Sequence, residues 1–251
     1  MPKSYRRITA AIARQIRLVV TDIDGTITID YDTLCPDALD AIRRLEKAGI
    51  PVGFCSGRFL SRIEASAREL GVTGPIIAEN GAVAKLSVSS ELIDLGYSRR
   101  CALEGLETLR KRYGDAIDVM EENQHRLVET TLRTAIHIAE LRQCLPPDTD
   151  INDSGYMMHI APKGVSKGKT LLALLGRIDG GLQPEQLLVF GDSLTDLSLF
   201  ELFPNSVLIT NPRIPAEERR RLEKVAKYTC EIPVGNGFAR VIEYFLTVRA
   251  T

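Results

Sequence analysis

The chain has 251 residues, enough for one large domain or for a domain with a second one inserted into it. Its 44% hydrophobic and 26% charged content is ordinary for a soluble globular protein. A net charge of -1 argues against nucleic-acid or anionic-membrane partners, and no apolar run approaches the roughly 20 residues that span a bilayer.

The cysteines and the basic N-terminus bear on the compartment. Five scattered cysteines without a Cys-x-x-Cys pair predict neither a disulfide framework nor a zinc site, which fits a cytoplasmic protein. The first seventeen residues are basic, with no acid before Asp22, as in a transit peptide. We favour the alternative of a helix packed on the core or a frayed extension before the first strand.

Two carboxylates follow the first apolar run of the chain. Residues 18–20 are apolar and include the β-branched Val19 and Val20, which predicts a buried parallel strand that delivers Asp22 and Asp24 to its C-terminal end. Carboxylates two residues apart repel each other unless a cation or a shared proton intervenes, and Mg²⁺ is the natural cation for them. A plain polar turn is the alternative. A calcium loop would need Glu at position 33, where Thr33 stands.

The pattern of an apolar strand followed by polar residues occurs twice more. Helical spacing over residues 36–48 leads to an apolar run at 50–55, and Ser56, Gly57 and Arg58 follow it directly. A second helix, 59–70, precedes a short strand at 75–78 that ends in a turn-prone Glu-Asn-Gly containing Asn80. Three successive β-α units predict an α/β fold with a doubly wound parallel sheet.

The pattern changes in the middle of the chain. Strands are expected at 86–95, 116–120 and 127–131, and helices at 101–112 and 135–145. We interpret residues 83–159 as an inserted α+β cap domain that serves as a lid, with 156–160 returning the chain to the main sheet. Residues 1–82 and 160–251 then form the catalytic core.

The α/β rhythm then resumes. A helix opens near Lys167, and a buried strand at 187–190 ends in a polar loop that carries Asp192 and Asp196. Strands at 206–209 and 228–230 and helices at 216–226 and 238–246 complete the core. Because parallel strands end at one edge of a sheet, polar residues that are distant in sequence are expected to converge there.

These motifs resemble the haloacid dehalogenase (HAD) superfamily, in the subgroup with a type IIB, Cof-like cap inserted into a Rossmann-like core. Asp22-Ile23-Asp24-Gly25-Thr26 is similar to the first family motif, Ser56 to the second and Lys167 to the third. The run Gly191-Asp192-Ser193, with Asp196, is similar to the fourth.

The resemblance implies a phosphatase mechanism. Asp22 would be the nucleophile that forms an aspartyl-phosphate, and Asp24 the general acid and base. Mg²⁺ would be held by Asp22, Asp24 through its backbone carbonyl, and Asp192, with Asp196 orienting Lys167 or a metal-bound water. Donors to the phosphoryl group would be Ser56 and Lys167, with Gly57, Arg58 and Asn80 beside the substrate.

One position departs from the family pattern, because Thr195 stands where Asn is common before the final Asp. Taken singly, each motif also has a structural interpretation: a turn at Ser56, a solvated Lys167, a helix cap at Asp192. His125, His137 and His159 lack metal-ligand spacing, and we interpret them as structural or peripheral.

Two rival functions remain open. Residues 164–170, Gly-Val-Ser-Lys-Gly-Lys-Thr, resemble the P-loop of NTP-binding proteins, in which Lys169 would contact the phosphates. That loop is one residue short between its glycines, and the interpretation leaves Asp22, Asp24 and Ser56 unused. A catalytically silent binding protein on the HAD fold is the second rival, and the presence of both Asp24 and Lys167 weighs against it.

Within the capped subgroup, short stretches resemble archaeal-type phosphoglycolate phosphatases, among them residues 74–81, 123–126 and 154–159. The expected substrate is phosphoglycolate or a related phosphorylated acid, and sucrose-phosphate or mannosyl-phosphoglycerate phosphatases are the alternatives. Recognition of the leaving group must come from the cap, where Arg126, on an expected strand edge, is our candidate for a carboxylate fork. The expected partner is thus a small phosphorylated metabolite, and a homodimer is an open option.

Overall fold

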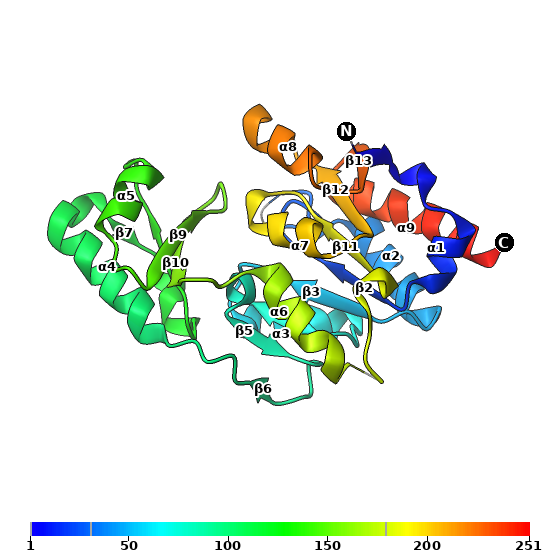
Figure 1. Ribbon diagram of the computed structural model, residues 1–251, viewed down its shortest axis with the longest axis horizontal. Coiled ribbons are helices and arrows are strands. Elements are labelled where there is room, and N and C mark those ends of the chain that lie inside the picture. Colours follow the sequence, from blue (N-terminus) through cyan, green and yellow to red (C-terminus); the bar gives the residue numbers. More distant parts are fainter. Residues whose placement is uncertain (1, 31, 179) are drawn as a thin grey trace.

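The computed structural model describes residues 2–30, 32–178 and 180–251, and their strands form two separate sheets (Figure 1). The larger sheet has nine strands in the order β1-β13-β12-β11-β2-β3-β4-β5-β6. Neighbours from β1 to β4 pair in parallel, and β5 and β6 add antiparallel strands at one edge. The strands are β1 (Lys3–Ser4), β2 (Leu18–Thr21), β3 (Val52–Cys55), β4 (Ile76–Ala78), β5 (Val83–Lys85), β6 (Leu92–Ile93), β11 (Leu187–Gly191), β12 (Ser206–Thr210) and β13 (Tyr228–Pro233).

Helices cover both faces of this sheet, as predicted for a doubly wound fold. Successive β2 residues point to opposite sides, so that Val19 packs in one apolar cluster while Leu18 and Val20 pack in the other. One face carries α1 (Ala10–Gln15), α2 (Pro36–Lys47), α3 (Leu60–Leu70) and α9 (Val234–Ala250), and the other α6 (Lys167–Leu174), α7 (Leu197–Leu202) and α8 (Ala216–Glu223).

The register of the central strands aligns their C-terminal ends. Thr21 of β2 pairs with Phe190 of β11 on one side and with Phe54 of β3 on the other. The loops that begin at Asp22, Ser56 and Asp192 therefore leave the sheet at the same edge. This is the edge at which open α/β sheets bind their ligands.

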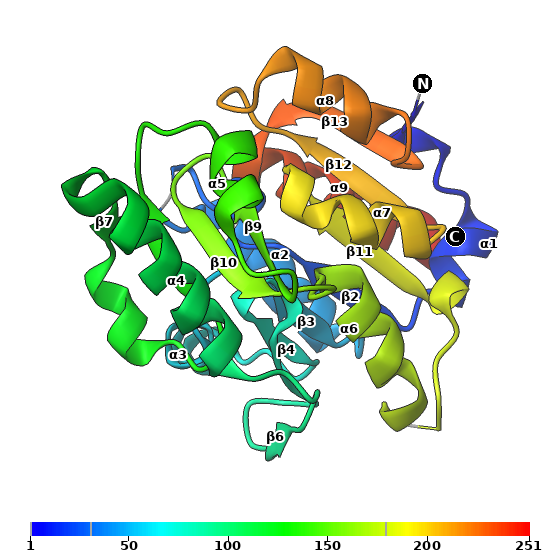
Figure 2. The same cartoon turned by 60° about the vertical axis from the view of Figure 1, so that its left-hand side comes forward.

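The smaller sheet is antiparallel, in the order β7-β8-β10-β9, and α4 and α5 pack on it around an apolar core of its own (Figures 1 and 2). We call this unit, residues 99–162, the cap and the remainder the core. Its elements are α4 (Arg99–Tyr113), β7 (Asp118–Val119), β8 (Thr130–Arg133), α5 (Ile138–Cys144), β9 (Thr149–Asp153) and β10 (Met158–Pro162).

The strands at the two joints between core and cap differ from the prediction. β5 and β6 belong to the core sheet, because the chain turns back at Gly81 and pairs antiparallel with β4. The expectation that residues 156–160 rejoin the main sheet is wrong, because β10 pairs with β8 and β9 in the cap. β10 is buried along its whole length, and an apolar run of that kind fits a central strand of either sheet.

The basic N-terminal segment packs on the core. β1 pairs with β13, and Ile8, Ala13 and Ile16 are buried in the cluster that also contains α9 residues. Tyr244 of α9 donates to the Arg6 carbonyl at 2.6 Å. Among the described residues, the helices are too short or too polar to cross a bilayer.

Candidate active site

Three carboxylates and one ammonium group meet at the C-terminal edge of the central strands. Oxygen atoms of Asp22, Asp192 and Asp196 lie within 4.8 Å of one another. The Lys167 ammonium lies 2.7 Å from Asp22 Oδ1 and 2.7 Å from Asp196 Oδ1. All four side chains are buried, and the distances confirm the predicted convergence of the carboxylates that follow β2 and β11. We call these four residues the core cluster.

Local chain geometry places each member of the core cluster. Asp22 and Asp192 directly follow β2 and β11, and Lys167 is the first residue of α6, whose N-terminus is capped by the Ser166 hydroxyl. Gly25 has a positive φ of 84°, and a Cβ there would lie 2.4 Å from Asp192 Oδ2. Glycine is therefore required for this loop to approach Asp192 so closely.

The core cluster carries excess negative charge in a buried place. Burial raises the pKa of Asp22 well above its usual value, the Lys167 ammonium lowers it, and Asp196 and Asp192 raise it further. Burial and the nearby Asp196 raise the pKa of Asp192 to about 7. Burial alone would lower the pKa of Lys167, but attraction to Asp196 and Asp22 raises it above the ordinary lysine value. One ammonium group does not balance three carboxylates.

Two residues that sequence reasoning did not select hold Asp192 in place. The Thr26 hydroxyl donates to Asp192 Oδ1 at 2.8 Å, and the Asn211 amide donates to Asp192 Oδ2 at 2.7 Å. Asn211 directly follows β12, so the rule that polar residues at strand ends converge could have found it. Both oxygens of Asp192 therefore have fixed directions.

Asp196 organises the fourth motif. Its Oδ2 accepts the backbone N–H groups of Asp192 at 3.0 Å and Ser193 at 3.1 Å, while Oδ1 faces Lys167. Thr195, the departure from the family pattern, places its hydroxyl 2.8 Å from that of Ser193. The loop keeps its hydrogen bonding with threonine at this position.

The core cluster fits a divalent cation. Buried carboxylates with raised pKa values and an uncompensated charge form the hard-oxygen donor set that Mg²⁺ prefers. Asp24 was predicted as a ligand through its backbone carbonyl, and its carboxylate is paired with Arg58, whose Nε donates to Asp24 Oδ2 at 2.9 Å. The Asp24 side chain lines the same cavity as Asp22 and Lys167 and is held there by the guanidinium group.

The loops after β3 and β4 lie next to the core cluster. The Ser56 hydroxyl accepts the backbone N–H of Arg58 at 3.2 Å, which leaves its own O–H to donate elsewhere. Asn80 has a positive φ of 53° and binds the Ser56 carbonyl through its backbone N–H at 3.1 Å. Ser56, Gly57, Arg58 and Asn80 all line one cavity with Asp22 and Lys167.

This cavity, of about 80 Å³, lies between the core loops and the cap. The cap supplies Glu122, Arg126, Ser154, Tyr156, Met157 and His159 to its lining. His159, interpreted as structural or peripheral, lies on β10 in the cavity wall, where its Nδ1 is 3.0 Å from Glu129 Oε2. Its position could not be read from the sequence, because β10 was assigned to the other sheet. His125 does stack on Phe59, with ring centroids 5.2 Å apart.

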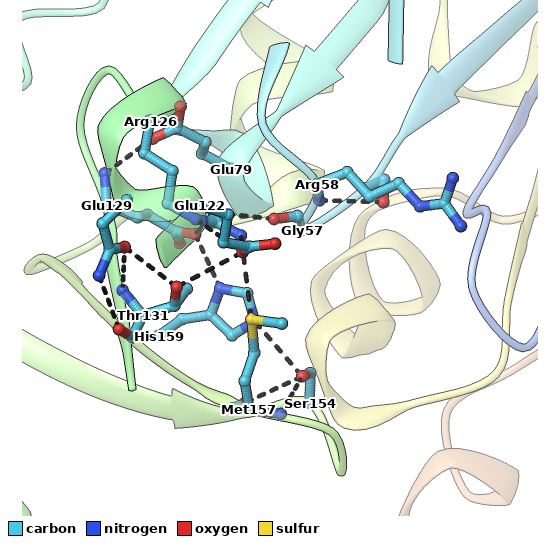
Figure 3. Close-up of polar contacts among 12 residues, drawn as sticks. Gly57, Arg58, Glu79, Glu122, Arg126, Glu129, Thr131, Ser154, Met157 and His159 are labelled. Atoms are coloured by element: carbon cyan, nitrogen blue, oxygen red, sulfur yellow. Dashed lines mark hydrogen bonds and ion pairs between the residues drawn. The ribbon is translucent and has the colours of Figure 1, made fainter. Parts of the chain in front are cut away.

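The placement of Arg126 on a strand edge is wrong. It lies between a 3-10 helix (Glu121–His125) and β8, and it is 2% exposed. Its N–H groups already have acceptors: Nε and Nη2 bind Glu122, Nη1 binds the Gly57 carbonyl and Glu129, and Nη2 also faces the Met157 sulfur (Figure 3).

The P-loop interpretation fails on geometry. Its expected phosphate-binding residue, Lys169, is exposed, whereas Lys167 points into the core cluster. The Thr170 hydroxyl donates to the Gly81 carbonyl at 2.6 Å and so serves packing between α6 and the core. The seven residues 164–170 form the entry to a helix whose first residue, not its third, contacts the carboxylates.

Comparison with known proteins agrees with this geometry. The haloacid dehalogenase-like hydrolase family matches residues 19–111 and 107–242. The chain is 30% identical to phosphoglycolate phosphatase of Methanobrevibacter smithii, over 92% of this chain and 99% of that protein. It is also 30% identical to phosphoglycolate phosphatase of Methanopyrus kandleri, over 91% and 97% of the two chains.

Solved structures agree on the fold. Thermoplasma acidophilum 0175 matches with a TM-score of 0.79 at 23% identity, over 92% of this chain and 98% of that one. A putative HAD/Cof-like hydrolase from Plasmodium vivax matches with a TM-score of 0.75 at 15% identity, over 95% and 98%. The predicted resemblance to archaeal phosphoglycolate phosphatases is confirmed, and the chain belongs to the haloacid dehalogenase-like hydrolases.

Proposed function

We propose that this hydrolase is a Mg²⁺-dependent phosphatase that cleaves a small phosphate monoester through an aspartyl-phosphate at Asp22. The observation that supports this best is the core cluster, in which Asp22 is fixed by Lys167 at one oxygen, Oδ1, at the edge of the cavity. A carboxylate in this position can attack phosphorus, while the ester oxygen leaves on the opposite side. Water then attacks the phosphorus of the acyl-phosphate and releases phosphate and the free carboxylate.

Asp24 is the proposed proton carrier. It would protonate the leaving alkoxide in the first step and take a proton from the attacking water in the second. Its ion pair with Arg58 holds the carboxylate at the cavity wall, where 29% of the side chain is exposed. Ser56 and Lys167 would donate to the phosphoryl oxygens, whose negative charge the cavity must stabilise.

Asp22, Asp192 and the backbone carbonyl of Asp24 would hold Mg²⁺, with Asp196 beside them. When bound, the ion supplies positive charge that lets an anionic nucleophile meet an anionic phosphoryl group. Thr26 and Asn211 would keep Asp192 oriented for that role through their hydrogen bonds. Burial and the nearby Asp196 raise the pKa of Asp192, and a bound cation would stabilise its ionised form.

The proposed substrate is phosphoglycolate or a related phosphorylated acid. The relatives' names support it. A leaving-group carboxylate needs a cationic partner. Arg126 could serve only by giving up its present acceptors, whereas Arg62 at the cavity is paired with the exposed Asp32, a weak surface pair that a substrate can replace.

The test is phosphate release from a panel of esters. Phosphoglycolate, a sugar phosphate, a sucrose phosphate and p-nitrophenyl phosphate are each assayed with Mg²⁺ and with excess EDTA. We expect the highest kcat/KM for phosphoglycolate and no turnover in EDTA. Preference for a sugar phosphate would select that alternative, and ATP binding without hydrolysis of any ester would reject the phosphatase proposal.

The cytoplasmic location and the homodimer stay predictions.

A further inference from the structure

Buried polar groups join the cap to the two core loops beside the cavity. We call this set the junction cluster; it consists of the Gly57 carbonyl, Glu79 and Asn80 from the core and Arg126, Glu129 and His159 from the cap, most of which Figure 3 shows. The four charged or ionisable side chains in it are at most 3% exposed. Buried charge is costly, so its presence at a joint between two units calls for a physical explanation.

Glu79, from the core, binds the main chain of the cap. Its carboxylate accepts three successive backbone N–H groups, from Leu127 at 2.7 Å, Val128 at 2.9 Å and Glu129 at 2.7 Å. Burial raises the pKa of Glu79, and these three bonds lower it. A core side chain thereby fixes the backbone of the segment that leads into β8.

Side chains of the cap also form hydrogen bonds to the core. Arg126 Nη1 donates to the Gly57 carbonyl at 3.0 Å, and the Asn80 amide donates to both carboxylate oxygens of Glu129 at 3.2 Å. Lifting residues 126–129 from the core would break all of these bonds together with those of Glu79. The contacts run in both directions, so the segment has one defined position.

Glu129 is the member that links the others. Its Oε2 lies 3.0 Å from His159 Nδ1 and 3.3 Å from Arg126 Nη1, while both oxygens face the Asn80 amide. An ionised carboxylate only accepts hydrogen bonds, so it orients three donors at once. One of these donors belongs to the core, one to the 126–129 segment and one to β10.

The junction cluster holds the loops after β3 and β4, which also carry residues proposed to bind the phosphoryl group. Gly57 follows Ser56 directly, and the Asn80 N–H binds the Ser56 carbonyl at 3.1 Å. The Glu79 N–H binds the Arg58 carbonyl at 3.0 Å, which ties the ends of β3 and β4 together. A Cβ on Gly57 would lie 3.0 Å from Asn80 Oδ1 and 3.2 Å from His159 Cε1, so cap and core are in van der Waals contact here.

We propose that Glu129 is a positioning residue that holds the cap at a fixed height above the Ser56 loop, so that the cavity admits only small leaving groups. The proposal rests on the proposed phosphatase function and adds to it a means by which the cap would limit the size of the leaving group. Apolar contacts between cap and core could be as stable as these ionic ones, but they would allow the cap to shift along the core surface. A fully hydrogen-bonded set of charges fixes one geometry.

The test compares Glu129→Gln with Glu107→Gln, the same change at an exposed position on α4 of the cap. kcat and KM are measured for phosphoglycolate and for p-nitrophenyl phosphate, whose leaving group is bulkier. Glu129→Gln should lower kcat/KM for phosphoglycolate about tenfold, mainly through KM, the scale of a lost charge-assisted hydrogen bond. The value for p-nitrophenyl phosphate should stay the same or rise, because a loosened cap admits it. Glu107→Gln should match wild type on both.

Hydrogen exchange provides a readout that does not depend on activity. Amides 127–129, which donate to Glu79, should exchange faster in Glu129→Gln, while the amides of α4 keep their rates. If Glu129→Gln does not fold, Asn80→Gly removes the core half of the bond, and glycine suits the positive φ at that position. The same faster exchange at 127–129 and the same divergence between the two esters are expected.

Equal losses on both esters would show that Glu129 serves folding alone and would overturn the proposal. Unchanged kinetics, or unchanged exchange at 127–129, would overturn it as well. If wild-type protein hydrolyses neither ester, the phosphatase function itself fails, and the exchange measurement still decides whether Glu129 holds the cap.

Discussion

The core cluster and the junction cluster are both sets of buried charged groups, and they differ in how fully those groups are hydrogen-bonded within the chain. In the core cluster one lysine faces three carboxylates, and burial raises the pKa of Asp192 to about 7. In the junction cluster every N–H group of Arg126 has an acceptor, and the Glu79 carboxylate accepts three N–H groups. The first set needs a further cation, and the second is complete within the chain.

This difference indicates that the two clusters have different roles, one in the reaction and one in holding the structure. An imbalance of buried charge is unstable on its own, so it marks the place where a ligand belongs. A set of buried charges whose hydrogen bonds are all made within the chain still has a desolvation cost, but it holds one defined geometry. Both sets meet at the same cavity, where we assign the reaction to the core cluster and the size limit to the junction cluster.

The largest expected effect is at the nucleophile. Asp22→Asn keeps the size of the side chain but removes the attacking charge, so turnover of phosphoglycolate should fall by on the order of 10⁴-fold or more. Asp40→Asn, on the exposed face of α2, is the control and should match wild type. Residual activity within tenfold of wild type would assign the chemistry to another residue.

The next effect distinguishes two lysines on the same helix. Lys167→Met leaves Asp22 and Asp196 buried without their cation, which should cost about 3–5 kcal/mol of stability in metal-free protein and most of the activity. Lys169→Met changes an exposed residue and should leave both nearly intact. Denaturant unfolding and phosphate release measure the two quantities. The reverse result would restore the P-loop interpretation.

A smaller effect concerns the leaving group. Arg62→Ala should raise KM for phosphoglycolate about tenfold with little change in kcat, as expected for a lost charge-assisted hydrogen bond to its carboxylate. Arg68→Ala, on the exposed side of the same helix, is the control. Arg126→Ala should instead destabilise the protein, because Glu122 and Glu129 lose their partner. If Arg126→Ala alone raises KM at unchanged stability, Arg126 is the carboxylate fork after all.

The smallest effect is a pH dependence of metal-free protein. The pKa of Asp192 is about 7 in the folded state, above its ordinary value of 3.8, so the folded state binds more protons between these values. Stability therefore falls as pH rises through that window, by about 2–4 °C in Tm for each 1 kcal/mol lost. Saturating Mg²⁺ should remove the loss, so the gap in Tm with and without the ion should widen from about pH 5 to about pH 8. A constant gap would contradict the charge imbalance.

The carboxylates of the core cluster were predictable because the sheet topology determines where they lie. Parallel strands end at one edge, so polar residues after each apolar run had to meet, and Asp22, Ser56 and Asp192 did. Asn211 obeys the same rule and was overlooked, since its strand carried no known motif. Lys167 needed the family resemblance, because a lysine at the start of a helix is usually solvated.

The junction cluster could not be predicted, for a physical reason. Its bonds between core and cap join residues 48 to 69 positions apart, and neither hydrophobic periodicity nor sheet topology specifies such pairs. Glu79 and Glu129 look like ordinary surface acids in sequence, and His159 lies on a strand that was assigned to the wrong sheet. Arg126 was singled out, but its burial and its hydrogen bond to the Gly57 carbonyl of the core do not follow from the sequence pattern.

The central claim is an aspartyl-phosphate at Asp22, and one trapping measurement tests it directly. Asp24→Asn should still be phosphorylated by ³²P-labelled acetyl phosphate in Mg²⁺, because its good leaving group needs little acid assistance, while hydrolysis is slowed by about 10²-fold or more. After acid quench and digestion, the label should lie on the peptide that contains Asp22 and should be released by hydroxylamine. Absence of the label, or its presence on a peptide without Asp22, would contradict the mechanism.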